Sequence, residues 1–297
     1  MKNPILTNLA YFDIFQHPLK EEELVSREDG MESNAILKSL VDQQQCFYYK
    51  AHYSIQPAIK KLVKEREIKE KRAEQYFKKL PFYAKVIKHF PFVRGIAISG
   101  SLSKGVMHAD GDIDYFIITS KNRLWICRTL LIFFKKIVLF NSRKYFCINY
   151  LVDEDNLEII DKNMFTAVEV SHLLPVYNRA LIDKLKERNK WSKKYYQSLN
   201  NIKKVKCFEG NSWIKSFAER SINFLSADQL DLFFMKLTYK RWSKKFKQFN
   251  AQKMELTMRT NRGVSKHHPK DFQTRVLGEY EKRLNKLIIS NEDTAIA

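Results

Sequence analysis

The sequence of 297 residues is poor in cysteine and glycine, and it contains no long uninterrupted hydrophobic run. Its four cysteines, Cys46, Cys127, Cys147 and Cys207, have no CxxC spacing, and the histidines have no partners at the spacing of a zinc site. A disulfide-stabilised secreted domain and a zinc-dependent fold are therefore not indicated. We expect a reduced, cytoplasmic protein.

The most apolar stretch, residues 124–140, is interrupted by Arg128, Lys135 and Lys136. A helix needs about 20 consecutive apolar residues to span a bilayer, so this segment is expected to be a buried helix instead. Polar residues and a proline also interrupt the apolar core that an N-terminal signal peptide would need. The sequence therefore predicts neither export nor a membrane partner.

Acidic residues are the scarcer charge, since 33 Asp and Glu are outnumbered by 53 Lys and Arg, a net charge of +20. Residues 184–297 hold 26 basic and 11 acidic residues, so most of this excess lies near the C-terminus. A basic surface attracts polyanions, such as nucleic acid, nucleotides or an acidic membrane surface. The hydrophobic fraction of 44% excludes a disordered chain and predicts a folded protein.

Residues 1–57 are expected to form a winged-helix-like domain. Three helices followed by a pair of strands are predicted over residues 5–15, 21–26, 32–44 and 46–55. The third helix offers only Lys38 as a basic contact, so duplex DNA binding is less favoured than a role in protein contact or domain packing.

Three further regions are predicted: connecting helices over residues 58–90, an α/β core over 91–163 and a helical, basic domain over 164–297. The core contains four predicted strands and one helix, over residues 95–99, 112–119, 123–140, 145–152 and 157–160. The fold class is therefore α/β (α+β), with a small mixed sheet between an N-terminal winged-helix-like domain and C-terminal helices.

A helix predicted over residues 230–249 has two distinct faces. One carries aromatic and aliphatic residues, including Phe233 and Leu237, and is expected to be buried. The other carries four lysines at helical spacing, Lys236, Lys240, Lys244 and Lys247. This basic face is either an ordinary solvated surface or a surface for phosphate groups, and the sequence leaves both interpretations open.

Four of the eight glycines fall within residues 95–111, which indicates a local need for bare backbone. Gly100-Ser101 follows an apolar strand, and its amides and hydroxyl suit a phosphate. Asp112 and Asp114 lie two residues apart on the next predicted strand, so their carboxylates point to the same face. Paired carboxylates are typical ligands of Mg²⁺ or Mn²⁺. The alternative is a solvated acidic turn without a ligand.

The pattern of Gly100-Ser101 followed by Asp112-Ile113-Asp114 resembles the signature of the polymerase β-type nucleotidyltransferase superfamily. The resemblance covers about residues 93–160. It implies that the aspartates hold the metal ions, that the Gly-Ser turn holds the triphosphate, and that a third carboxylate lies on a later strand. The implied reaction transfers a nucleoside monophosphate to an acceptor and releases pyrophosphate.

The third carboxylate is where the sequence departs from this pattern. Asn149 lies at the expected place on the strand over residues 145–152, and an amide brings no charge and is a poor base. A different strand register, or Glu158 on the returning strand, would supply an acid instead. The departure bears on catalysis more than on binding of metal or nucleotide.

Basic residues outside the motif are further candidates for phosphate contacts. Lys104 and His108 lie in the loop between the glycine turn and the aspartates. Around Gly263, six basic side chains gather in one segment: Arg259, Arg262, Lys266, His267, His268 and Lys270. We expect a loop in which Lys266 and His268 close over the nucleotide, with a merely solvated basic loop as the alternative.

Two functions follow from these features. The first is a metal-dependent nucleotidyltransferase that uses a nucleoside triphosphate and an unidentified acceptor, such as RNA or a phosphorylated small molecule. The second is a catalytically impaired protein of the same fold that senses nucleotide or binds nucleic acid. A carboxylate within metal-bridging reach of Asp112 and Asp114 would favour the enzyme, and its absence the sensor.

Overall fold

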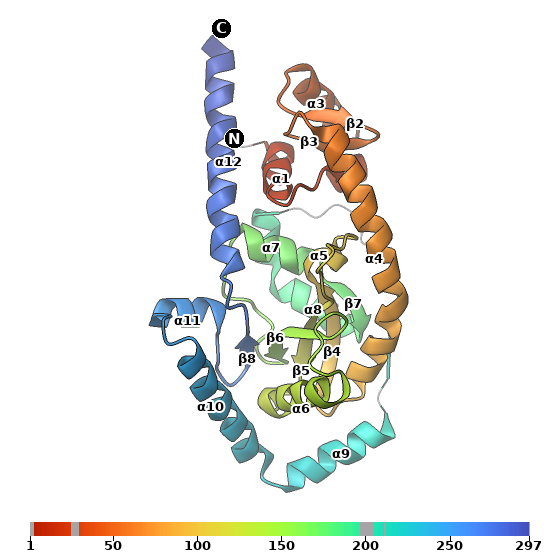
Figure 1. The fold of residues 1–297 in the computed structure, drawn as a ribbon, viewed down its shortest axis with the longest axis vertical. Helices are drawn as coiled ribbons and strands as arrows, with labels where there is room; N and C mark the ends of the chain where they lie inside the picture. Colours follow the sequence, from red (N-terminus) through yellow and green to blue (C-terminus); the bar gives the residue numbers. More distant parts are fainter. Residues whose placement is uncertain (1–2, 25–29, 197–204, 211, 297) are drawn as a thin grey trace.

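The computed structural model describes residues 3–24, 30–196, 205–210 and 212–296. Within these residues the chain is a mixed α/β structure with a three-stranded and a five-stranded sheet (Figure 1). The predicted fold class is correct at this level. No helix in the described residues is long and apolar enough to cross a membrane.

The N-terminal part contains three helices and a small antiparallel sheet. Their bounds are α1 (Pro4–Asp13), β1 (Leu19–Lys20), α2 (Glu21–Leu24), α3 (Gly30–Asp42), β2 (Phe47–Tyr49) and β3 (His52–Ser54), with strand order β1-β3-β2. Asn3 caps α1 through its side chain, and the predicted apolar positions Leu9, Phe12, Leu37 and Leu40 are buried in one core. The helices and strand pair follow the predicted order, and β1 is an additional strand.

Helix α4 (Ile59–Lys88) is one continuous helix of 30 residues, although the sequence predicted two helices separated near Pro81. Proline disfavours a helix interior because it lacks the N–H group and crowds the preceding turn. Leu80, Ala84 and Ile87 nevertheless bury one face of α4 on both sides of this point. Packing of α4 against the large sheet therefore outweighs the local cost of Pro81.

The central sheet has the strand order β7-β4-β5-β6-β8. Its strands are β4 (Val93–Ser99), β5 (Asp114–Thr119), β6 (Cys147–Asp153), β7 (Leu174–Tyr177) and β8 (Val264–Lys266). Strands β5 and β6 are parallel, and the other neighbours are antiparallel. Helix α6 (Leu124–Val138) connects the parallel pair, as expected for a crossover.

Several predicted elements differ from the structure. No strand forms at the predicted position 157–160. Strands β7 and β8 both lie beyond residue 163, so the expectation of helices alone in the C-terminal part is wrong. They are only four and three residues long, too short for alternation of apolar and polar residues to reveal them.

Helices cover both faces of the central sheet (Figure 1). Helices α4 and α6 pack with Ile96, Ile98 and Ile117 in one apolar cluster. The opposite face, with Ala97 and Phe116, forms a second cluster with α7 (Met164–Ser171) and α8 (Arg179–Arg188). Helix α7 also contributes to the core of the N-terminal part, so it joins the N-terminal helices to the sheet.

The remaining elements run from residue 190 to the C-terminal end. They are a 3₁₀ helix (Lys190–Lys194), α9 (Trp213–Phe224), α10 (Ala227–Lys245), α11 (Ala251–Thr257) and α12 (Phe272–Ile296), and the short helix α5 (Gly100–Ser103) precedes them in the chain. Helices α9 and α10 extend around the lower end of the molecule, and α12 lies beside α1 (Figure 1).

Candidate metal and phosphate site

The turn at Gly100 lies where β4 ends and α5 begins. Gly100 has φ +69°, a left-handed conformation that glycine tolerates best. A Cβ atom at this position would also lie 2.6 Å from Oδ2 of Asp114. Both constraints require glycine, and they place the Asp114 carboxylate directly against the backbone of the turn.

The acidic pair lies across from this turn. Asp112 precedes β5 and Asp114 begins it, opposite Ser99 in the antiparallel pairing with β4. Ligand atoms of Asp112, Asp114 and Cys147 all lie within 4.8 Å of one another. This is the one group among the described residues in which three such side chains are arranged to hold a metal ion.

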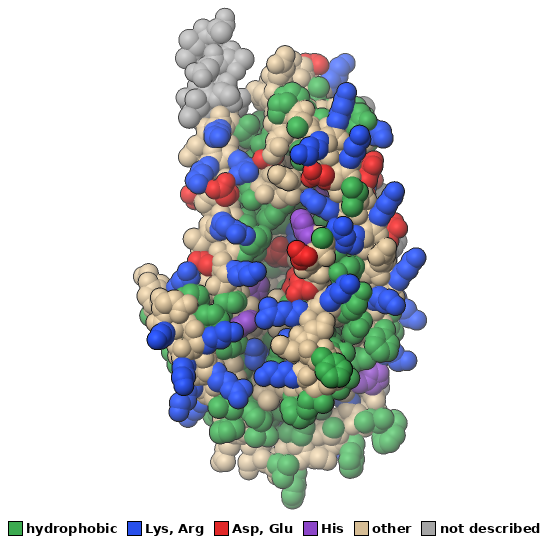
Figure 2. All heavy atoms as spheres, viewed as in Figure 1, with side chains coloured by type: hydrophobic (Ala, Val, Ile, Leu, Met, Phe, Trp, Pro, Cys, Tyr) green, Lys and Arg blue, Asp and Glu red, His purple; other side chains and the backbone are tan. Residues whose placement is uncertain are grey.

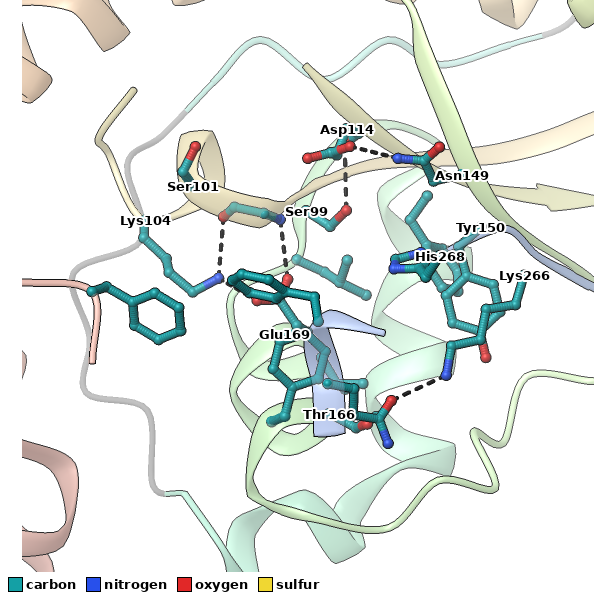
Figure 3. A pocket seen from close by; sticks show the side chains of 18 of the residues that line it. Ser99, Ser101, Lys104, Asp114, Asn149, Tyr150, Thr166, Glu169, Lys266 and His268 are labelled. Carbon is teal, nitrogen blue, oxygen red and sulfur yellow. Dashed lines mark hydrogen bonds and ion pairs between the residues drawn. The ribbon is translucent and has the colours of Figure 1, made fainter. Parts of the chain in front are cut away.

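Two uncharged side chains occupy the part of β6 where a third carboxylate was sought. Cys147 pairs with Asp114 across the parallel strands, and the Nδ2 atom of Asn149 donates to Oδ1 of Asp114 over 2.9 Å (Figure 3). Glu158 instead forms a surface ion pair with Lys162, with about half of each side chain exposed. Asp114 therefore has a neutral amide and a thiol as its neighbours on β6.

Asp114 is the most perturbed acid of the site. Burial raises its pKa, and repulsion by Asp112 raises it further, to about 7, although hydrogen bonds from Cys147 and Asn149 act in the opposite direction. Burial and the two aspartates also raise the pKa of the Cys147 thiol, so this sulfur stays protonated at neutral pH. Among the described residues no ion pair to Asp112 or Asp114 is found, and no cation is among the main influences on the pKa of Asp114.

Glu169 is a site residue that the sequence analysis missed. Its carboxylate accepts a hydrogen bond from the Gly100 N–H (3.0 Å) and pairs with the Lys104 ammonium (2.7 Å; Figure 3). Burial raises the pKa of Glu169, but Lys104 and the Gly100 N–H outweigh it and lower the pKa below its ordinary value. An anionic group of the protein itself thus occupies the turn predicted to bind phosphate.

One signal in the sequence marked Glu169: it is the single charged residue in the apolar helix MFTAVEVS. An isolated acid on a buried helix needs a partner. The sequence does not show which partner that is, because Lys104 lies 65 residues away.

A cavity of about 370 Å³ adjoins the turn. It is lined by residues of α1, α7 and α12 and of the strands β4, β5, β6 and β8. Six of the predicted or newly found residues line it together: Gly100, Ser101, Lys104, Asp114, Asn149 and Glu169. His108 also lines the cavity, as do four aromatic side chains from α1, the turn after it, α7 and α12, namely Phe12, Phe15, Phe165 and Phe272.

Lys266 and His268 line the same cavity, but Lys266 belongs to a strand and only His268 lies in the irregular segment after it. Lys266 ends strand β8, which pairs with β6, and its ammonium contacts Asp161 (2.8 Å) and Gln273 (3.1 Å). Asp161 also pairs with Arg259 at 2.9 Å. The prediction that Lys266 belongs to a loop that closes over the nucleotide is therefore wrong. Lys266 is buried, forms an ion pair with Asp161 and lies in strand β8 of the sheet.

The two histidines of this segment differ in their surroundings. His267 packs against the ring of Trp242, with centroids 5.0 Å apart. The Nε2 atom of His268 is buried without a hydrogen-bond partner among the described residues, and the ring lies at the cavity between Asn149 and Tyr150 (Figure 3). Burial lowers the pKa of His268 to about 4, so the ring is neutral at physiological pH.

Comparison of this chain with protein-family models, with curated proteins and with solved structures finds no match. The interpretation of the site consequently rests on its residues. The site consists of Asp112 and Asp114 beside the turn at Gly100, the Glu169 carboxylate that accepts a hydrogen bond from this turn, and the adjoining cavity.

Proposed function

We propose that the protein is a metal-dependent nucleotidyltransferase that uses a nucleoside triphosphate. One observation carries the proposal: Asp112 and Asp114 share a compact group beside the left-handed turn at Gly100. Burial and the neighbouring Asp112 raise the pKa of Asp114, so a divalent cation held by this carboxylate pair would stabilise the ionised form of Asp114.

The donor set suits a hard cation such as Mg²⁺ or Mn²⁺. Asp112 and Asp114 offer carboxylate oxygens, whereas Cys147 keeps its proton and is no thiolate ligand in this state. When bound, the metal would neutralise charge on the triphosphate. Asp114 would be held in its ionised form, and Asn149 would orient that carboxylate through its hydrogen bond.

In the proposed reaction, a hydroxyl oxygen of the acceptor forms a bond to the α-phosphorus of the triphosphate. The bond from that phosphorus to the oxygen bridging to the β-phosphate breaks, and pyrophosphate leaves. The hydroxyl proton passes to solvent. The Glu169 carboxylate accepts a hydrogen bond from the Gly100 N–H, and a phosphate bound at Gly100 would accept from the same N–H. Binding of the phosphate therefore requires that Glu169 give up this hydrogen bond.

A second function is a nucleotide sensor without transfer activity. The absence of a third acid from the group of Asp112, Asp114 and Cys147 favours it, as does the contact of Glu169 with the turn. The sensor would use the same cavity and the same metal ligands. The two functions therefore differ in transfer of the nucleotide and not in its binding.

The test combines binding and transfer. The protein is incubated with triphosphates labelled at the α-phosphate, with Mg²⁺ or Mn²⁺ and with RNA, protein and small-molecule fractions of a cell extract. The variant D112N/D114N should lose metal-dependent binding and transfer, and the exposed Asp110→Asn is the matched control. Binding without transfer would identify the sensor, and absence of metal-dependent binding would refute both functions.

A further inference from the structure

Helix α9 presents most of its large apolar side chains to solvent. Two of its charged residues face the protein: the buried Lys215 donates to the carbonyl of Val93, and Glu219 accepts from the Phe92 N–H and pairs with Arg94. Lys215 and Glu219 are one helical turn apart, so they define the inward face, on which Ile222 also packs against the core. Arg220 and the other large apolar residues of α9 lie on the exposed side.

That outward face is strongly apolar and exposed. Trp213 is 78% exposed, Phe217 68% and Phe224 90%, and Ile214 and Leu225 also lie on the surface. A surface helix ordinarily turns such residues toward the core. This arrangement leaves α9 with an aromatic surface that nothing in the described part of the chain covers.

This surface continues onto the neighbouring helices. Helix α10 contacts both α6 and α9, and its Phe233 and Leu237, predicted to be buried, are 57% and 38% exposed. The second half of α6 and the residues just after it carry four more exposed apolar side chains: Phe133, Ile137, Val138 and Phe140. Figure 2 shows hydrophobic side chains gathered at the lower end of the molecule, where Figure 1 places α6 and the turn between α9 and α10.

Basic residues follow the apolar surface along α10. Lys236, Lys240, Lys244 and Lys247 are exposed, and they begin beside Phe233 and Leu237. With a rise of about 1.5 Å per residue, Phe233 and Lys244 lie about 16 Å apart along the helix axis. An apolar tip is thus followed by a band of exposed lysines. These are the four lysines that the sequence left open as either a solvated surface or a surface for phosphate groups.

We propose that the α9–α10 tip, defined by Trp213, Phe217, Phe224, Leu225 and Phe233, docks on an anionic lipid surface. Aromatic and aliphatic side chains would enter the boundary between headgroups and acyl chains, and the lysines of α10 would contact lipid phosphates. This is attachment to a surface and not a crossing of the bilayer, which agrees with the lack of a spanning helix among the described residues.

Charge decides between this occupant and others. A second copy of the chain would bring the lysines of α10 close to an equally basic surface, in a protein with net charge +20. Duplex nucleic acid would contact the lysines through its phosphates but would leave the aromatic tip in water, because its bases are already stacked and paired. An anionic lipid surface satisfies both the apolar tip and the basic band.

The test is sedimentation of the full chain with vesicles of phosphatidylglycerol and phosphatidylcholine, compared with vesicles of phosphatidylcholine alone. We expect binding to the anionic vesicles and a blue shift of tryptophan emission that is lost in Trp213→Phe. The variant F224S/L225S should bind at least about tenfold more weakly, because two apolar side chains leave the lipid. The exposed Phe82→Ser on α4 is the matched control and should bind as the unmodified protein does.

A charge-reversal variant tests the basic band. K236E/K240E should weaken binding by about tenfold or more, and increasingly so at low salt, whereas K71E/K78E on α4 should change it far less. Circular dichroism checks that each variant is folded. The proposal is overturned if anionic vesicles do not bind the protein, or if F224S/L225S binds them unchanged. It is also overturned if the protein dimerises in solution and F224S/L225S abolishes the dimer, because the tip would then be covered by a second copy.

Discussion

Two partly buried aspartates, Asp161 and Asp114, line the same cavity but differ in the partners of their carboxylates. Asp161 pairs with Lys266 and Arg259, and although burial raises its pKa, these two cations lower it below the ordinary value. Asp114 has a neutral amide as its hydrogen-bond partner, and burial together with Asp112 raises its pKa to about 7. The comparison separates a carboxylate that stabilises the fold from one that needs a proton or an added cation.

The largest expected difference between the two aspartates is in stability. Asp161→Asn leaves the buried Lys266 and Arg259 without their shared anion and should cost about 3–5 kcal/mol of unfolding free energy. Asp114→Asn removes an uncompensated charge and should cost none at about pH 8, where Asp114 is ionised. Urea unfolding of both variants measures the difference. Equal losses would show that Asp114 is also a stabilising carboxylate.

A second difference is in pH dependence. In the unfolded chain Asp114 ionises near the ordinary pKa of an aspartate, 3.8, whereas in the native state its pKa is about 7. Between these values the native state binds more protons, so this residue lowers stability as the pH rises, by a few kcal/mol at most. Above pH 7 its contribution stays constant.

Stability measured from about pH 4 to pH 8 in the unmodified protein and in Asp114→Asn isolates this effect. The slope attributed to Asp114 should be missing in the variant, and Mg²⁺ or Mn²⁺ should raise the melting temperature of the unmodified protein more above pH 7 than below it. A variant with the same pH profile as the unmodified protein would contradict the raised pKa.

A third, smaller effect is expected at Glu169. Its carboxylate pairs with the Lys104 ammonium and also accepts from the Gly100 N–H, which a phosphate ligand would need. Glu169→Ala should free the Gly100 N–H and the Lys104 ammonium and raise the affinity for inorganic tripolyphosphate by about tenfold. Calorimetry measures this affinity, with the exposed Glu158→Ala as control. A lower affinity in Glu169→Ala would mean that the carboxylate orders the turn and does not block it.

The smallest effect is expected at Cys147. Its thiol lies within the acidic group but stays protonated, and Mg²⁺ prefers oxygen ligands. Cys147→Ser should therefore change the affinity for Mg²⁺ by less than about twofold, while it should weaken binding of Cd²⁺, a soft cation, by much more. A large loss of Mg²⁺ affinity would place Cys147 in the packing that fixes Asp114.

The local part of the site could be predicted from the sequence. Gly100 and the aspartate pair are separated by a short segment. A rare glycine indicates an unusual backbone conformation, and the alternation of side chains along a strand indicates which of them share a face. Asn149 was also expected beside the aspartates, and its hydrogen bond to Asp114 agrees with that placement. These residues depend on neighbouring strands, whose side-chain directions follow a simple period of two.

Features that depend on long-range packing could not be predicted. Glu169 reaches the turn because α7 packs across the sheet, and strand β8 is defined by its pairing with β6 and not by its three residues. The basic residue Lys266 appeared free for a ligand because its partner Asp161 lies 105 residues away in the sequence. The exposed face of α9 was unpredictable for the same reason. Its inward face is fixed by contacts of Lys215 and Glu219 with residues 92–94, which are distant in the sequence.

The position of α1 has a consequence for any attempt to divide the protein. Phe12 of α1 and Phe15 just after it form part of the cavity wall, and Arg66 of α4 joins this helix to the N-terminal part by pairing with Glu23. Removal of residues 1–57 would open the cavity to water and expose its aromatic side chains. A shortened chain would therefore lose one wall of the candidate site together with its first helices, and the N-terminal part is better understood as a component of that site than as an appendage.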